Sequence, residues 1–69
     1  MDLRGIHPVE MPKEDGVYLI KVRARGGRTV LGSAFYIGNL GNFVNFKLRD
    51  GKIFEGEVDL PVVAWRKLF

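Results

Sequence analysis

The feature that most constrains the fold of this chain is the alternation of apolar and polar residues, interrupted at short intervals by turns. From position 17 the apolar residues recur with a period of two, as in a half-buried strand. Turn signals rich in Gly, Asn, Asp or Pro follow at 26–27, 38–42, 50–51 and 59–61. They separate five expected strands, which begin at 17, 28, 43, 52 and 62. Such short connections predict an antiparallel meander.

The alternation also predicts which side chains face the core. In the first strand we expect Tyr18, Ile20, Val22 and Ala24 to point inward. In the third strand we expect Val44, Phe46 and Leu48 to point inward, and Phe43, Asn45, Lys47 and Arg49 to point outward. The strand at 28–37 has apolar residues on both faces and contains Gly32, so we expect a bend and burial on both sides. The predicted fold class is therefore an all-β, small five-stranded antiparallel meander, forming an SH3-like barrel or half-barrel.

The length of 69 residues allows one domain, and the chain has no cysteine, so no disulfide can stabilise that domain. Residues 1–15 lack periodicity and contain Pro8 and Pro12, so we expect an N-terminal arm that packs Ile6, Val9 and Met11 on the domain formed by 16–69. In the last strand we expect Val63 and Trp65 on one face, with Trp65 in the core, and Val62, Ala64 and Leu68 on the other. An apolar C-terminal edge and a marginal core make a homodimer one expected assembly.

Catalytic constellations are not visible in the sequence. His7 is the only histidine and precedes Pro8 in the arm, where nothing orients it as a base. Glu55 and Glu57 are spaced like paired carboxylates but are expected on a solvated strand. One histidine and no thiolate make a zinc site improbable. We therefore predict a protein that is not an enzyme and has no metal site and no cofactor.

The charge distribution supplies the main functional lead. The net charge is +3, and no acidic residue occurs between positions 16 and 49. If the first and third strands flank the second, the outward residues of this stretch line one basic face. The predicted macromolecule-binding set is Lys21, Arg23, Arg25, Arg28, Phe43, Asn45, Lys47 and Arg49. A protein with an acidic surface fits this set, and so does single-stranded nucleic acid; a merely solvated strand face is the third interpretation.

A family resemblance points in the same direction. The elements Met11-Pro12, Asp15-Gly16 with Tyr18, Ala34 with Tyr36, Phe43, and Val63 with Trp65 and Leu68 resemble a family of short phage and prophage proteins of unknown function. The likeness spans residues 11–68. The chain lacks the tryptophan usual at the family's start and the proline-rich tail after its final tryptophan. The resemblance implies a phage or prophage setting and an all-β fold, and it implies no activity.

Together these observations predict a small non-enzymatic binding protein, phage- or prophage-associated, that binds and inhibits a host macromolecular complex of defence or transcription. The alternative is a nucleic-acid-binding β-barrel module that uses its basic face. The absence of cysteine fits a reducing compartment, the first residues lack a leader pattern, and no apolar run approaches a membrane helix. We therefore expect a cytoplasmic protein without a membrane partner.

Overall fold

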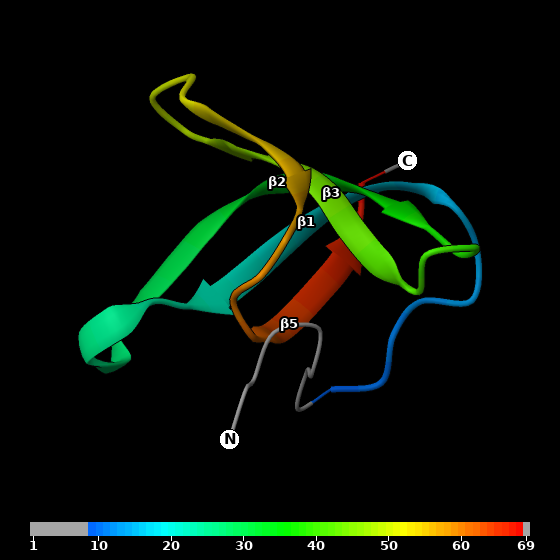
Figure 1. Ribbon diagram of the computed structural model, residues 1–69, viewed down its shortest axis with the longest axis horizontal. Coiled ribbons are helices and arrows are strands. Elements are labelled where there is room, and N and C mark those ends of the chain that lie inside the picture. The colour runs from blue at the N-terminus through cyan, green and yellow to red at the C-terminus, as the bar shows by residue number, and fades with distance from the viewer. Residues whose placement is uncertain (1–8, 69) are drawn as a thin grey trace.

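The computed structural model describes residues 9–68 and contains five strands. They are β1 (Gly16–Arg23), β2 (Thr29–Ile37), β3 (Asn42–Leu48), β4 (Ile53–Glu57) and β5 (Val62–Lys67). A single 3-10 turn, Arg25–Gly27, joins β1 to β2. The strands form one sheet of order β4-β3-β2-β1-β5, in which every ladder is antiparallel (Figure 1). The prediction of an all-β antiparallel meander is confirmed, and in the described ladders β4 and β5 are the two edge strands.

The turns form where glycine and aspartate allow the chain to reverse. At the β3–β4 turn, Gly51 has a φ of 95° and the Asp50 carboxylate accepts a 2.9 Å hydrogen bond from the Lys52 amide. At the β2–β3 turn, Gly41 has a φ of 66° and its amide donates to the Ile37 carbonyl. These are conformations that other residue types adopt only at a cost. The hairpin signals in the sequence therefore lie at the true reversals.

The core lies on one side of the curved sheet. Tyr18, Ile20 and Val22 of β1 are at most 2% exposed, as the alternation predicts. Tyr18 also makes edge-to-face contacts with the rings of Tyr36 and Phe43, at centroid distances of 6.2 and 5.7 Å. Such contacts add to the stabilisation from apolar burial. The buried cluster is completed by Ala34, Phe46, Val58 and Val62.

The outward placement of Phe43 is wrong. Phe43 is fully buried and pairs with the core residue Tyr36. Strict alternation fails here because the β3 register shifts at Asn45, which has a positive φ of 56° and forms a bulge. The extra residue allows Phe43 and Phe46, three positions apart, to share the core face. Val44 is opposite Phe35 and therefore lies on the other face.

A second irregularity corrects the prediction for the last strand. Val62 pairs with Val22 and Trp65 pairs with Ile20, because the β1–β5 register shifts between these two pairs. Val62 and Trp65 therefore share the core face, and Val62 is fully buried. Trp65 is 37% exposed and lies at the border of the core, where its ring meets Tyr18 edge-on. The prediction that Trp65 lies within the core is wrong.

The described part of the arm, residues 9–15, is held against the sheet by polar contacts. The Trp65 indole N–H donates to the Glu10 carbonyl at 2.7 Å, and the Tyr18 hydroxyl donates to the Glu14 carbonyl at 2.8 Å. The Glu14 carboxylate forms an ion pair with Lys67, and this hydrogen bond raises the pKa of the Lys67 amine. Val9 and Met11 pack on the core as expected. Ile6 and His7 lie outside the described residues.

Candidate functional site

The face of the sheet opposite the core is the best candidate for a functional surface, and we call it the outer face. The second strand is not buried on both sides as expected: Leu31 and Phe35 are 46% and 42% exposed, and Ile53 of β4 is 52% exposed. Direct cross-strand pairing places Val17, Leu19 and Ala64 on the same face. Exposed apolar side chains that gather on one sheet face mark an interaction surface more often than scattered ones do.

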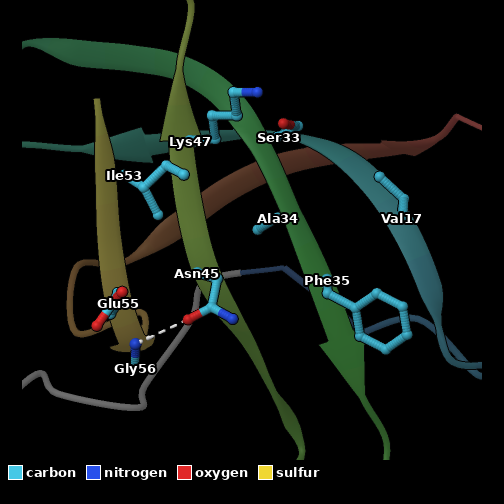
Figure 2. Close-up of a pocket in the computed structure, with 9 residues that line it drawn as sticks. All are labelled: Val17, Ser33, Ala34, Phe35, Asn45, Lys47, Ile53, Glu55 and Gly56. Atoms are coloured by element: carbon cyan, nitrogen blue, oxygen red, sulfur yellow. Dashed lines mark hydrogen bonds between the residues drawn. The ribbon is translucent and has the colours of Figure 1, made fainter. Parts of the chain in front are cut away.

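Three shallow depressions run across the outer face. The largest, about 660 Å³, lies over β2, β3 and β4 and is lined by Phe35, Ile53 and Lys47 among others (Figure 2). It shares Ser33 and Lys47 with a second depression of about 320 Å³. The second in turn shares Leu19 and Leu31 with a third of about 280 Å³, which reaches β5. The shared linings make the outer face one continuous surface from β4 to β5.

Basic side chains lie among the apolar ones on this surface. Lys21, Lys47, Arg49 and Arg66 line the three depressions and are exposed. Among the described residues that line the three depressions, Glu55 is the only acidic one. Four positive charges to one negative give the outer face a positive potential, which attracts an acidic partner. Lys21 lies between Leu31 and Ala64, and Lys47 is paired with Ile53, so apolar area and positive charge alternate across the outer face.

The structure brings only some residues of the predicted binding set together. Lys21 and Lys47 lie on the outer face and Arg49 lies just beyond the end of β3, so these predicted residues are brought together. Arg23 is at the end of β1, and Arg25 and Arg28 lie in the β1–β2 loop. These loop residues are exposed but do not line the outer depressions.

The two remaining predicted residues, Phe43 and Asn45, have roles in the fold itself. Phe43 belongs to the core and contributes nothing to the outer face. Asn45 lines the largest depression, but its side-chain oxygen accepts a 2.9 Å hydrogen bond from the Gly56 amide (Figure 2). That bond joins the bulge of β3 to the edge strand β4, where Gly56 has a φ of 89°. Asn45 therefore helps to fix the shape of the largest depression, because its side chain is bonded to Gly56.

The exposed residues of the outer face that were not predicted as binding residues include Leu31, Phe35, Ile53 and Arg66. The uneven alternation of residues 28–37 was the available signal, because it placed Leu31 and Phe35 opposite the core-facing residues. Arg66 becomes part of the face because it pairs with Leu19 across the β1–β5 ladder. That neighbourhood joins distant parts of the chain and has no local signature.

Comparisons with models of known protein families, with curated proteins and with solved structures gave no match. Within residues 9–68, no helix has the length and apolar character needed to cross a membrane. The same part of the chain contains no group of three or more His, Asp or Glu side chains arranged to hold a metal ion.

Proposed function

We propose that this chain is a non-enzymatic binding protein whose outer face docks on the acidic surface of another protein. The observation that carries the proposal is the continuous outer face, on which Leu31, Phe35 and Ile53 are exposed and basic side chains lie beside them. Covering these apolar side chains removes them from water, and the basic side chains beside them steer an acidic partner into place.

The charge of the outer face supports a partner other than a second copy. A two-fold homodimer through this face would set Lys21, Lys47, Arg49 and Arg66 of one copy against the same residues of the other. Like charges placed against one another in an interface are unfavourable. The homodimer predicted from the sequence therefore finds no support on this face, whereas an acidic heterologous partner does.

Single-stranded nucleic acid is the second candidate partner. Phe35 is 42% exposed and lines the same depression as Lys47, so a base has an aromatic ring to stack on beside a cation. Trp65 also lines the third depression, and the other apolar residues of this surface are mainly aliphatic, with Leu31, Ile53 and Leu19. Aliphatic side chains suit a protein partner better than stacked bases, which favours the first candidate.

Occlusion of a partner's surface is the mode of action that we propose for such a small chain. A host complex of defence or transcription with an acidic surface fits this mode, and inhibition follows when the covered surface is one that the complex needs. The phage setting implied by the family resemblance stays a prediction.

The test is a pull-down of the tagged protein from bacterial lysate, with and without nuclease. The outer-face variant is Lys47→Glu/Arg66→Glu, and the control is Lys13→Glu/Arg28→Glu, which makes the same charge change at exposed positions away from the outer depressions. A discrete protein that survives nuclease, disappears in the outer-face variant and stays in the control supports the proposal.

Two other outcomes count against a protein partner at this face. Retention by both variants places the contact elsewhere on the molecule. Recovery of nucleic acid alone, abolished by nuclease and weakening steeply as salt rises, establishes the second candidate. Circular dichroism of each variant shows that the sheet is intact before binding is compared.

A further inference from the structure

A single row of side chains crosses the outer face from one edge strand to the other. Its members pair directly with one another in the four ladders, in the order Ile53, Lys47, Ser33, Leu19 and Arg66. Figure 2 shows the first three of them on β4, β3 and β2. Apolar residues and cations therefore follow one another along the row, with the small Ser33 at its middle.

This row forms the floor of a trough. On β2, Ser33 lies between Leu31 and Phe35, whose larger side chains are on the same face about 7 Å to either side. The three depressions of the outer face follow the row, because Ser33 and Lys47 line the first two and Leu19 lines the second and third. Four strand spacings make the trough about 19 Å long.

An occupant of the trough cannot pair its backbone with the sheet. The trough runs over β1, β2 and β3, which have a strand on both sides, so their N–H and C=O groups point at neighbouring strands. An extended segment pressed against this face would bury its own backbone groups without partners, which is costly. An α-helix pairs those groups internally, and about 13 of its residues span the trough. A helix is therefore the single segment that fits best.

The charges of the lining select the composition of such a helix. Lys47 and Arg66 belong to the row, and Lys21 and Arg49 line its sides. The described lining residues set these four cations against one acid, Glu55. Because the apolar residues lie between the cations, a complementary helix carries apolar and acidic side chains on one face.

We propose that the trough binds an acidic amphipathic α-helix of a partner protein, an inference that rests on the proposed function because it names the element that the outer face receives. Apolar side chains of the helix pack between Leu31 and Phe35, and its carboxylates lie beside Lys47 and Arg66. Single-stranded nucleic acid and a second copy of the chain are the other occupants that the experiment distinguishes.

The experiment titrates synthetic peptides with blocked ends into the isotope-labelled full chain and follows the backbone amide signals by NMR. The probe has roughly 15 residues, with leucines at i, i+3, i+4 and i+7 and glutamates at both borders of that face. One comparison peptide has a proline at its centre, which breaks the helix, and another has the proline at its first position, which a helix tolerates. A third has lysines for the glutamates.

We expect the probe and the peptide with the first-position proline to shift the signals of Leu31, Ser33 and Lys47. We expect the central-proline and lysine peptides to bind at least about tenfold more weakly. Equal binding of the two proline peptides, equal binding of the lysine peptide, shifts outside the trough, or no shifts at millimolar peptide each overturn the proposal.

Ser33→Phe and Thr29→Phe form a matched pair, since both place a phenylalanine on the outer side of β2, and Thr29 does not line the three depressions. Ser33→Phe fills the trough and should abolish the shifts, whereas Thr29→Phe should leave them unchanged. Shifts that persist in Ser33→Phe contradict a helix in the trough. The comparison of peptides needs no variant, so it decides the matter even if Ser33→Phe does not fold.

A pull-down with Ser33→Phe separates this proposal from the proposed function. A partner protein that is lost in Lys47→Glu/Arg66→Glu but retained by Ser33→Phe keeps the acidic partner and rejects the helix in the trough. A partner retained by Lys47→Glu/Arg66→Glu rejects the proposed function, and the helix with it. Displacement of the peptide by oligothymidylate identifies nucleic acid as the occupant, and concentration-dependent shifts without peptide identify a second copy; both overturn the proposal.

Discussion

Replacing Gly32 with alanine tests the packing of the sheet most directly. Gly32 is buried in β2, opposite Ile20 on one side and Leu48 on the other. A Cβ atom at this position would lie 2.5 Å from the Lys47 carbonyl oxygen and 2.6 Å from a ring carbon of Phe46. Both distances are well inside the roughly 3.5 Å at which non-bonded atoms attract. The backbone oxygen belongs to the β2–β3 ladder and moves only if the ladder loosens.

The expected effect is a loss of about 2 kcal/mol in the free energy of unfolding. Overpacking of a core costs about 1–3 kcal/mol, and contact with a backbone atom favours the upper end of that range. The alanine regains about 0.4–1 kcal/mol because it restricts the unfolded chain. At a site with free space the same substitution would stabilise the protein, so the sign of the change is itself diagnostic. A melting temperature lower by roughly 8–16 °C corresponds to this loss in a domain of this size.

Urea unfolding followed by the fluorescence of Trp65 measures the effect. The companion variant is Phe46→Leu. It removes the ring that the added Cβ atom would contact and leaves the other contact, the Lys47 carbonyl oxygen, in place. In a double-mutant cycle we expect Gly32→Ala to cost less in the Phe46→Leu background than alone, with a coupling of about 1 kcal/mol. An unchanged or increased stability of Gly32→Ala would refute the packing described for β2 and β3.

Three further outcomes are expected. Asn45→Ala should lower the free energy of unfolding by about 2 kcal/mol, because it loses the bond to Gly56 and keeps a positive φ; Asn45→Asp should be nearly neutral in the same urea assay. Trp65→Phe should cost at least about 1 kcal/mol and speed hydrogen exchange of the arm amides, since the indole N–H contact to Glu10 is lost along with part of the ring that meets Tyr18. The bond with Glu14 raises the pKa of Lys67 above 10.5, so its stabilisation is complete below pH 10.5 and is lost as pH rises through the folded pKa. When the free energy of unfolding is measured as a function of pH, the Lys67→Met variant should not show this part of the decrease at alkaline pH.

Local patterns in the sequence predicted the strands and turns well. Period-two alternation located β1, and the glycine turns located the reversals, because both depend on neighbouring residues alone. Gly32 was predicted to mark a bend, and its position also leaves room for the Phe46 ring. That close approach joins two strands, so no local pattern reveals it.

The predicted site was partly correct for the same reason. Lys21 and Lys47 share the outer face as expected, because β1 and β3 flank β2. Phe43 was misplaced because one bulge, at Asn45, reverses the faces of the residues before it. A bulge at an asparagine has a weak signature in the sequence, since asparagine tolerates positive φ but does not require it.

The exposed outer face follows from the single-layer architecture. A sheet needs a second layer to bury both of its faces, and here the sheet curls to enclose a core on one side only. Leu31, Phe35 and Ile53 therefore stay in contact with water, at a cost in solubility that the neighbouring basic side chains offset. These three side chains are about half exposed and none belongs to the buried core cluster. Their exposure on one face is the feature on which the proposed binding function rests.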